Sequence, residues 1–316
     1  MLFRSIVPVG AKEAGKTVFM TVLVHELKHR IGEQLNAAIG GADDFTRHQF
    51  PTEYEGPLYR ESRLPSPTTT TAGAPNRPPF VFGFTIERSR PRVLGASLAR
   101  AGRRGGPEPE RALLSFLDTA GEDLRTTQSM EDNVRCLGAA DGILLLLDPL
   151  QLQAARDTAE PGTRLPAHGH GDDPLTVLQN FTDILQAGRR QEGRGDRPGD
   201  LIDRPLAIVF TKMDALLPSL AETSPLRRPP PRAAYFDEQD SQAVHTQIRL
   251  LLDRWHGGEI DRTARLNYRT YRYFGVSALG ETPTGDNRVS ARGIRPYRVT
   301  DPMLWLLGQF GVIPVK

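Results

Sequence analysis

The chain of 316 residues has little cysteine, little tryptophan and almost no net charge. Its single cysteine, Cys136, excludes a disulfide within the chain and a zinc site built from several cysteines. Lysine and arginine number 40 and aspartate and glutamate 38, and this balance argues against an obligatory nucleic-acid-binding protein. No apolar run reaches the roughly 18 residues that a membrane span requires, and no signal peptide fits before the first strand. We therefore expect a cytoplasmic protein without nucleic acid among its partners.

What the chain does contain is short apolar runs that alternate with longer amphipathic stretches, together with 30 glycines and 26 prolines. Strands that alternate with helices predict a mostly parallel sheet covered on both faces, which is a three-layer α/β fold. Runs of apolar residues without alternation, as in 142–147 and 206–210, are typical of strands buried on both faces. The predicted strands are residues 3–9, 80–86, 112–117, 142–147, 206–210 and 271–276. The predicted helices are residues 17–35, 174–187, 237–255 and 301–310.

Five segments rich in glycine, proline or charge interrupt this pattern. Their lengths exceed those of ordinary connections, so we expect flexible insertions within a single domain that spans residues 1–316. The insertions are residues 40–79, 88–109, 151–173, 188–203 and 218–234.

The first predicted strand runs directly into a glycine-rich loop, GAKEAGKT at residues 10–17, which matches G-x-x-x-x-G-K-[ST]. Such a loop turns successive backbone N–H groups toward phosphate oxygens, and the following helix adds positive potential. In this arrangement Lys16 reaches the β- and γ-phosphates and the hydroxyl of Thr17 binds Mg²⁺. The predicted nucleotide-binding residues here are Gly10, Glu13, Ala14, Gly15, Lys16, Thr17 and Val18.

The third predicted strand ends in Asp118, within the sequence DTAGE at residues 118–122. An aspartate in this place can hold Mg²⁺ and balance the metal charge. Gly121 offers its N–H to the γ-phosphate where a side chain would collide. The D-x-x-G pattern is common and indicates little by itself. Its position at the end of a predicted strand makes it a more specific indication of a phosphate and metal site.

The fifth predicted strand leads into Thr211, Lys212 and Asp214, which resemble the [NT]-K-x-D guanine-specificity motif. The carboxylate of Asp214 can accept hydrogen bonds from guanine N1–H and the exocyclic amine, a donor pair that adenine lacks. The stem of Lys212 would lie over the base. Asparagine is commoner at the position of Thr211, and we expect threonine to lack the brace that an asparagine carboxamide would provide.

The last predicted strand is followed by Ser277, Ala278 and Leu279, whose turn can offer backbone N–H groups to guanine O6. These four patterns, each at the end of a strand and in this order, resemble those of the Ras-like (TRAFAC) P-loop GTPases, and more narrowly the bacterial double-GTPase proteins. The resemblance implies a six-stranded sheet with strand two antiparallel to strand three. It also implies hydrolysis of GTP to GDP with Mg²⁺, and a protein effector or activating partner in a multi-protein system.

The resemblance leaves the switch residues open. A switch threonine must join Mg²⁺, and Thr68, Thr69, Thr70 and Thr71 all lie in the right interval; we take Thr70 for the run. Glu122 stands where Ras-family proteins have a water-orienting glutamine, so the expected catalytic residues are Lys16, Gly121 and Glu122.

No arginine finger can be assigned, which predicts unassisted turnover of about 10⁻⁴ to 10⁻³ per second. Two other functions stay open at this point. One is a nucleotide-bound scaffold that does not hydrolyse, and the other is an ATP-dependent P-loop NTPase.

Overall fold

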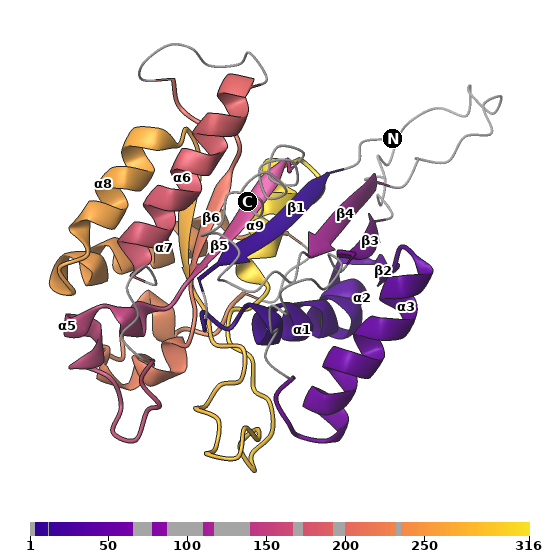
Figure 1. Ribbon diagram of the computed structural model, residues 1–316, viewed down its shortest axis with the longest axis horizontal. Coiled ribbons are helices and arrows are strands. Elements are labelled where there is room, and N and C mark those ends of the chain that lie inside the picture. Colours follow the sequence, from indigo (N-terminus) through magenta and orange to yellow (C-terminus); the bar gives the residue numbers. More distant parts are fainter. Residues whose placement is uncertain are drawn as a thin grey trace, which may run out of the picture.

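The computed structural model describes residues 4–11, 13–65, 78–86, 110–116, 140–166, 173–191, 200–231 and 235–316. Within these ranges seven strands form one sheet, in the order β2-β3-β4-β1-β5-β6-β7 (Figure 1). The strands are β1 (Ser5–Gly10), β2 (Ala37–Gly41), β3 (Phe80–Ile86), β4 (Glu110–Phe116), β5 (Gly142–Leu147), β6 (Leu206–Phe210) and β7 (Tyr271–Gly275).

Most of the sheet is parallel. β1 pairs in parallel with β4 and β5, and the parallel pairing continues through β6 to β7. β3 runs antiparallel to β4, as the second and third predicted strands should, and β2 runs antiparallel to β3. The predicted fold class is confirmed, but the described sheet has seven strands and not six. The added strand, β2, reads AAIGG, and alanine and glycine give little strand signal.

The predicted first helix is continuous but not α-helical throughout. It begins as α1 (Lys16–Glu26), passes through the π-helix η1 (Leu27–Ile31) and ends as α2 (Gly32–Leu35). In the described part of the chain no helix is both long and apolar enough to cross a membrane. The other helices are α3 (Asp44–Phe50), α5 (Gln153–Arg156), α6 (Pro174–Gln191), α7 (Glu238–Arg254), α8 (Gly258–Asn267), α9 (Asp301–Gln309), the π-helix η2 (Pro51–Arg60) and the 3₁₀ turns η4 (Pro149–Gln151), η5 (Met213–Ala215), η6 (Leu217–Ser219) and η7 (Pro225–Arg227).

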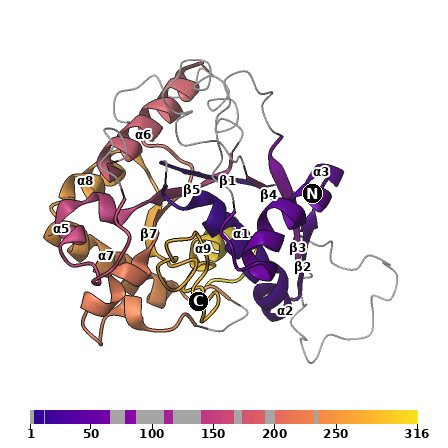
Figure 2. The ribbon, with the colours of Figure 1, turned by 60° about the horizontal axis from the view of Figure 1, so that its bottom comes forward.

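Helices cover both faces of the sheet, because alternate side chains of the central strands point to opposite sides. Leu144 and Leu146 of β5 belong to a core cluster that contains α1 and α9, which lie next to each other in Figure 2. Ile143 and Leu145 belong to a second cluster with α6, α7 and α8, the group on the left of Figure 1. The strands buried on both faces are those that the unbroken apolar runs predicted.

Within the insertion expected at 40–79, residues 44–60 form the helices α3 and η2. Asp43 caps α3 by accepting a hydrogen bond from the Thr46 N–H at 2.6 Å. The aromatic side chains of this segment pack on β3, with the ring of Phe50 centred 4.8 Å from that of Phe82. Burial of these rings supplies the stabilisation that the polar composition did not indicate.

Three other expected insertions also contain regular structure. The segment 151–173 includes the end of η4 and all of α5, and 218–234 includes η7, where Leu226 is fully buried. α6 extends through the first residues of 188–203. Residues 88–109 lie outside the described residues.

β7 forms one edge of the sheet, and a histidine covers part of that edge. The Tyr273 N–H donates to Nδ1 of His245 on α7 at 3.1 Å, and the two rings stack with centroids 5.2 Å apart. Burial, reinforced by the positive charges of Arg272 and Arg249, lowers the pKa of His245 from 6.5 to about 4. The imidazole is therefore neutral in the folded chain. Its lone pair accepts a hydrogen bond from an edge-strand N–H that would otherwise be free to pair with another strand.

This buried histidine should make stability fall in mild acid. The unfolded chain takes up a proton near pH 6.5 and the folded chain only near pH 4, so stability is lost as the pH falls through that interval. The loss amounts to about 3 kcal/mol. We expect His245→Gln to flatten this part of the pH profile in denaturant unfolding, and His48→Gln on the exposed side of α3 to leave it unchanged. An unchanged profile in His245→Gln would contradict the assignment.

Candidate functional site

Three of the four sequence patterns meet along the edge of the sheet that is formed by the carboxyl ends of its parallel strands. The strands β1, β6 and β7 are parallel, so their carboxyl ends lie on the same side. The glycine-rich loop follows β1, the segment with Thr211 and Asp214 follows β6, and the turn at Ser277 follows β7. Residues far apart in the sequence are thereby placed in contact.

Two glycines fix the path of the loop after β1. A Cβ on Gly10 would lie 2.5 Å from the backbone oxygen of Leu146 in β5, so only glycine allows this approach of the two strands. Gly15 has φ +78° and caps α1 in the left-handed conformation, and Glu13 has φ +61°. The alternation of conformations forms a concave backbone of the kind that binds anions.

The amino end of α1 opens onto this loop. Within the described residues no side chain caps the helix, and its first turn contains no acidic residue, so its positive end faces the loop. The side chain of Lys16 folds back over the loop, and its Nζ donates to the Gly10 carbonyl at 2.8 Å. An ammonium in that position lies where phosphate oxygens would enter.

Thr211 joins the loop to the segment after β6. Its hydroxyl donates to the Ala14 carbonyl at 2.9 Å and lies 3.3 Å from the carbonyl oxygen of Leu147, and the side chain is buried. Although we expected Thr211 to lack the brace of an asparagine carboxamide, its hydroxyl bonds the loop directly. The two patterns are held in register by a direct bond across 197 residues.

Lys212 is held by a residue that the sequence patterns did not single out. Its Nζ contacts the Asp148 carboxylate at 2.6 Å, and the carboxylate's other oxygen accepts the Leu150 N–H at 2.9 Å. The Asp148 side chain is 3% exposed and that of Lys212 33%. The sequence did contain a signal for Asp148, since it is a charged residue directly after the fully buried strand β5. That position lies at the same carboxyl edge of the sheet as the other patterns.

Asp214 lies in the same group. The Ser277 hydroxyl donates to one of its carboxylate oxygens at 2.6 Å, and the Gly280 N–H donates to that hydroxyl at 2.8 Å. Burial raises the pKa of Asp214 above its usual range, although the bond from Ser277 opposes this shift. A buried carboxylate held in one orientation is suited to a ligand that presents hydrogen-bond donors.

The turn after β7 offers fewer donors than expected. The Ser277 N–H already donates to the Tyr297 carbonyl at 3.0 Å, and the Leu279 carbonyl accepts from Arg295 N–H at 2.9 Å. Among the described residues, neither the Ala278 N–H nor the Leu279 N–H has a hydrogen-bond partner. A ligand carbonyl at this turn would therefore be met by these two N–H groups.

The remaining predicted residues, Thr70, Asp118, Gly121 and Glu122, lie outside the described residues. Of the three predicted Mg²⁺ ligands the structure thus describes Thr17, in the first turn of α1. The described residues contain no group of three or more histidine, cysteine, aspartate or glutamate side chains that could hold a metal.

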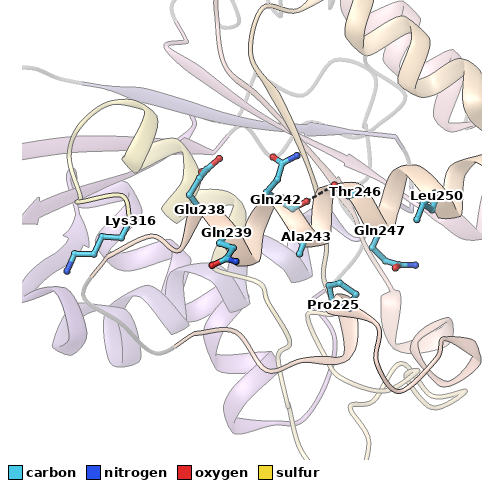
Figure 3. Close-up of a pocket in the computed structure, with 9 residues that line it drawn as sticks. All are labelled: Pro225, Glu238, Gln239, Gln242, Ala243, Thr246, Gln247, Leu250 and Lys316. Atoms are coloured by element: carbon cyan, nitrogen blue, oxygen red, sulfur yellow. Dashed lines mark hydrogen bonds between the residues drawn. The ribbon is translucent and has the colours of Figure 1, made fainter.

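A separate groove of about 660 Å³ lies on the outer side of α7 (Figure 3). None of the predicted site residues lines it, and its wall is mostly uncharged, with Glu238 and Lys316 as its charged residues. Its lining residues are Pro225, Glu238, Gln239, Gln242, Ala243, Thr246, Gln247, Leu250 and Lys316.

Comparisons with known proteins give one clear relative. The chain is 30% identical over 327 aligned positions, which cover 96% of it and 74% of the relative, to a protein of Mycolicibacterium smegmatis described as "Putative ESX-1 scaffolding and assembly protein SaeC". No protein-family model matches the chain.

Two solved structures resemble it at lower similarity. One is a signal recognition particle receptor SRb-GTP/SRX complex from Chaetomium thermophilum, with 13% identity, TM-score 0.36, and coverage of 90% of this chain and 95% of that one. The other is the Arl6 BBS3 small GTPase from Trypanosoma brucei with bound GppNp, with 11% identity, TM-score 0.35, and coverage of 98% of both chains. At these TM-scores the likeness is general.

Proposed function

The chain belongs to the family of SaeC, and we propose that it is a guanine-nucleotide-binding protein of the Ras-like P-loop type that acts as a nucleotide-dependent switch. The observation that carries the proposal is the bond from Thr211 to Ala14 together with that from Ser277 to Asp214. These two contacts bring the loop after β1 together with the residues after β6 and β7, and this proximity supports a single nucleotide site. Neither pattern by itself would distinguish a nucleotide from another anion.

The roles follow from position and charge. The loop and the amino end of α1 bind the phosphates through backbone N–H groups and Lys16. Asp214 accepts the two guanine donors while Ala278 donates to the base oxygen, and the stem of Lys212, held by Asp148, lies along the base. Mg²⁺ would be held by Thr17 with Asp118 and Thr70, and it would neutralise charge on the phosphates.

The family adds a second candidate function. SaeC is described as a scaffolding and assembly protein. This description favours a nucleotide-bound module whose partners are proteins. In that case the nucleotide stabilises one conformation and hydrolysis is slow or absent. Slow turnover is also expected because no arginine finger can be assigned. The narrower likeness to double-GTPase proteins, which act with partners, is compatible with either function.

Calorimetry on chain freed of bound ligand tests the proposal. We expect GDP and GTP with Mg²⁺ to bind, and ADP and ATP to bind at least about 100-fold more weakly, because adenine leaves the buried Asp214 without a donor. Equal affinity for ADP would favour the ATP-dependent alternative, and absence of binding by any of the four would remove the proposal. Phosphate release over many turnovers then distinguishes a hydrolase from a scaffold.

A further inference from the structure

The segment between β7 and α9 forms a lobe that reaches from the candidate base pocket to a distant part of the chain. We call residues 280–297 the post-β7 lobe; it follows Leu279 directly and projects at the bottom of Figure 1. Its base is clamped. Ser277 and Tyr297 exchange two backbone bonds of 3.0 and 2.8 Å, and Arg295 N–H donates to Leu279 at 2.9 Å.

Gly280 makes this clamp rigid. It has φ +84°, and a Cβ there would lie 2.3 Å from the Arg295 backbone oxygen. The two ends of the lobe therefore touch at the residue whose N–H donates to the Ser277 hydroxyl, and that hydroxyl in turn donates to Asp214. A displacement of Asp214 or Ser277 on base binding must pass into the base of the lobe.

The tip of the lobe is attached elsewhere. After a turn closed by the Thr284 N–H to the Arg288 carbonyl at 3.0 Å, the chain pairs with residues 62–64 as a short antiparallel bridge. The Leu64 N–H donates to the Asn287 carbonyl and the Val289 N–H to the Ser62 carbonyl, both at 2.9 Å. Val289 is buried in the core cluster against which Leu64 packs.

Residues 62–64 stand just before the part of the chain in which the switch threonine is expected. The pairing thus connects, through backbone hydrogen bonds, the residues that would recognise the base with the chain that leads to the switch.

We propose that the post-β7 lobe is a coupling element that transmits binding of the base beside Asp214 to residues 62–64. The proposal rests on the proposed guanine-nucleotide function and adds to it a route from the base to these residues that does not require the γ-phosphate. One end of the lobe is bonded to Asp214 through the Ser277 hydroxyl. The other end is bonded to residues 62–64 through two backbone hydrogen bonds.

Hydrogen exchange measured with GDP, which has no γ-phosphate, isolates this route. In the unaltered chain we expect GDP to slow exchange in a peptide covering residues 58–66 by about fivefold or more. Val289→Pro removes the N–H that bonds Ser62, and Val289→Ala keeps it. The first variant should still bind GDP in calorimetry but lose the slowing, and the second should retain both.

Leu64→Pro, with Leu64→Ala as its match, breaks the other bond of the bridge and guards against a folding defect in the first pair. Slowing by GDP that persists in both proline variants would overturn the proposal, as would GDP binding to the unaltered chain without any slowing. If the unaltered chain binds no GDP at all, calorimetry shows that the proposed function has failed, and the coupling falls with it.

Discussion

Replacing Asp214 by asparagine is expected to weaken GDP and GTP binding by about 10- to 100-fold and to favour xanthine nucleotides. Each hydrogen bond to a charged group contributes about 1.5–3 kcal/mol, and the amide oxygen of asparagine can keep one of the two that the carboxylate accepts from guanine, so the expected loss corresponds to one bond. An amide in the same place would donate to the xanthine oxygen. The Ser277 hydroxyl, 2.6 Å from the carboxylate, can bond an amide oxygen equally well, so the orientation should persist.

The measurement is competition between GDP and XDP for a fluorescent analogue. Asp203→Asn, which removes an exposed carboxylate paired with Arg269, serves as the control and should bind as the unaltered chain does. Burial raises the pKa of Asp214 in the ligand-free chain. As the pH is lowered, GDP affinity should therefore begin to decline at a higher pH than it would with an ordinary aspartate. The asparagine variant should lack that decline, and unchanged base preference would remove the guanine assignment.

Replacing Arg298 by alanine is expected to destabilise the fold by about 3–5 kcal/mol. Its side chain is almost wholly buried, and the guanidinium donates to Asp240 at 2.7 Å and Asp301 at 2.8 Å, and to the carbonyls of Pro225 and Arg228 at 3.3 and 3.0 Å. These partners come from α7, α9 and the η7 region. The truncation would leave the carboxylates of Asp240 and Asp301 without this buried donor, whereas the Pro225 and Arg228 carbonyls keep bonds from the Arg228 N–H and the Tyr297 hydroxyl.

Denaturant unfolding checks this expectation. Arg292→Ala, which removes an exposed guanidinium from its contact with Glu281, should change stability by less than about 1 kcal/mol. Arg298→Lys keeps the charge but cannot reach all four acceptors, so an intermediate loss is expected. A loss in Arg298→Ala no larger than that in Arg292→Ala would show that the buried network contributes little to stability.

The sequence was sufficient where a pattern reflects local physics. The unbroken apolar runs of β5 and β6 predicted strands buried on both faces, and the glycines at 10 and 15 predicted a strand-to-helix loop. It failed for β2 and for the helices α3 and η2. Their alanine, glycine and polar residues carry little intrinsic preference, and packing of Phe50 on β3 decides their structure.

Within the candidate site the same division holds. The order of residue types after β1, β6 and β7 identified Lys16, Thr211, Asp214 and Ser277 without coordinates. Asp148 was missed because a single aspartate after a strand is unremarkable until Nζ of Lys212 lies 2.6 Å away.

By itself, then, the sequence predicted which residues would carry phosphate-type and guanine-type chemistry, because such a prediction depends on side-chain identity and spacing within a few residues. Only the tertiary structure decided that Thr211 braces Ala14, that Arg298 joins three elements, and that the post-β7 lobe meets residues 62–64. Each of these contacts joins positions tens to hundreds of residues apart. The free energy of such a pair depends on how the whole chain folds back on itself, which no local pattern encodes.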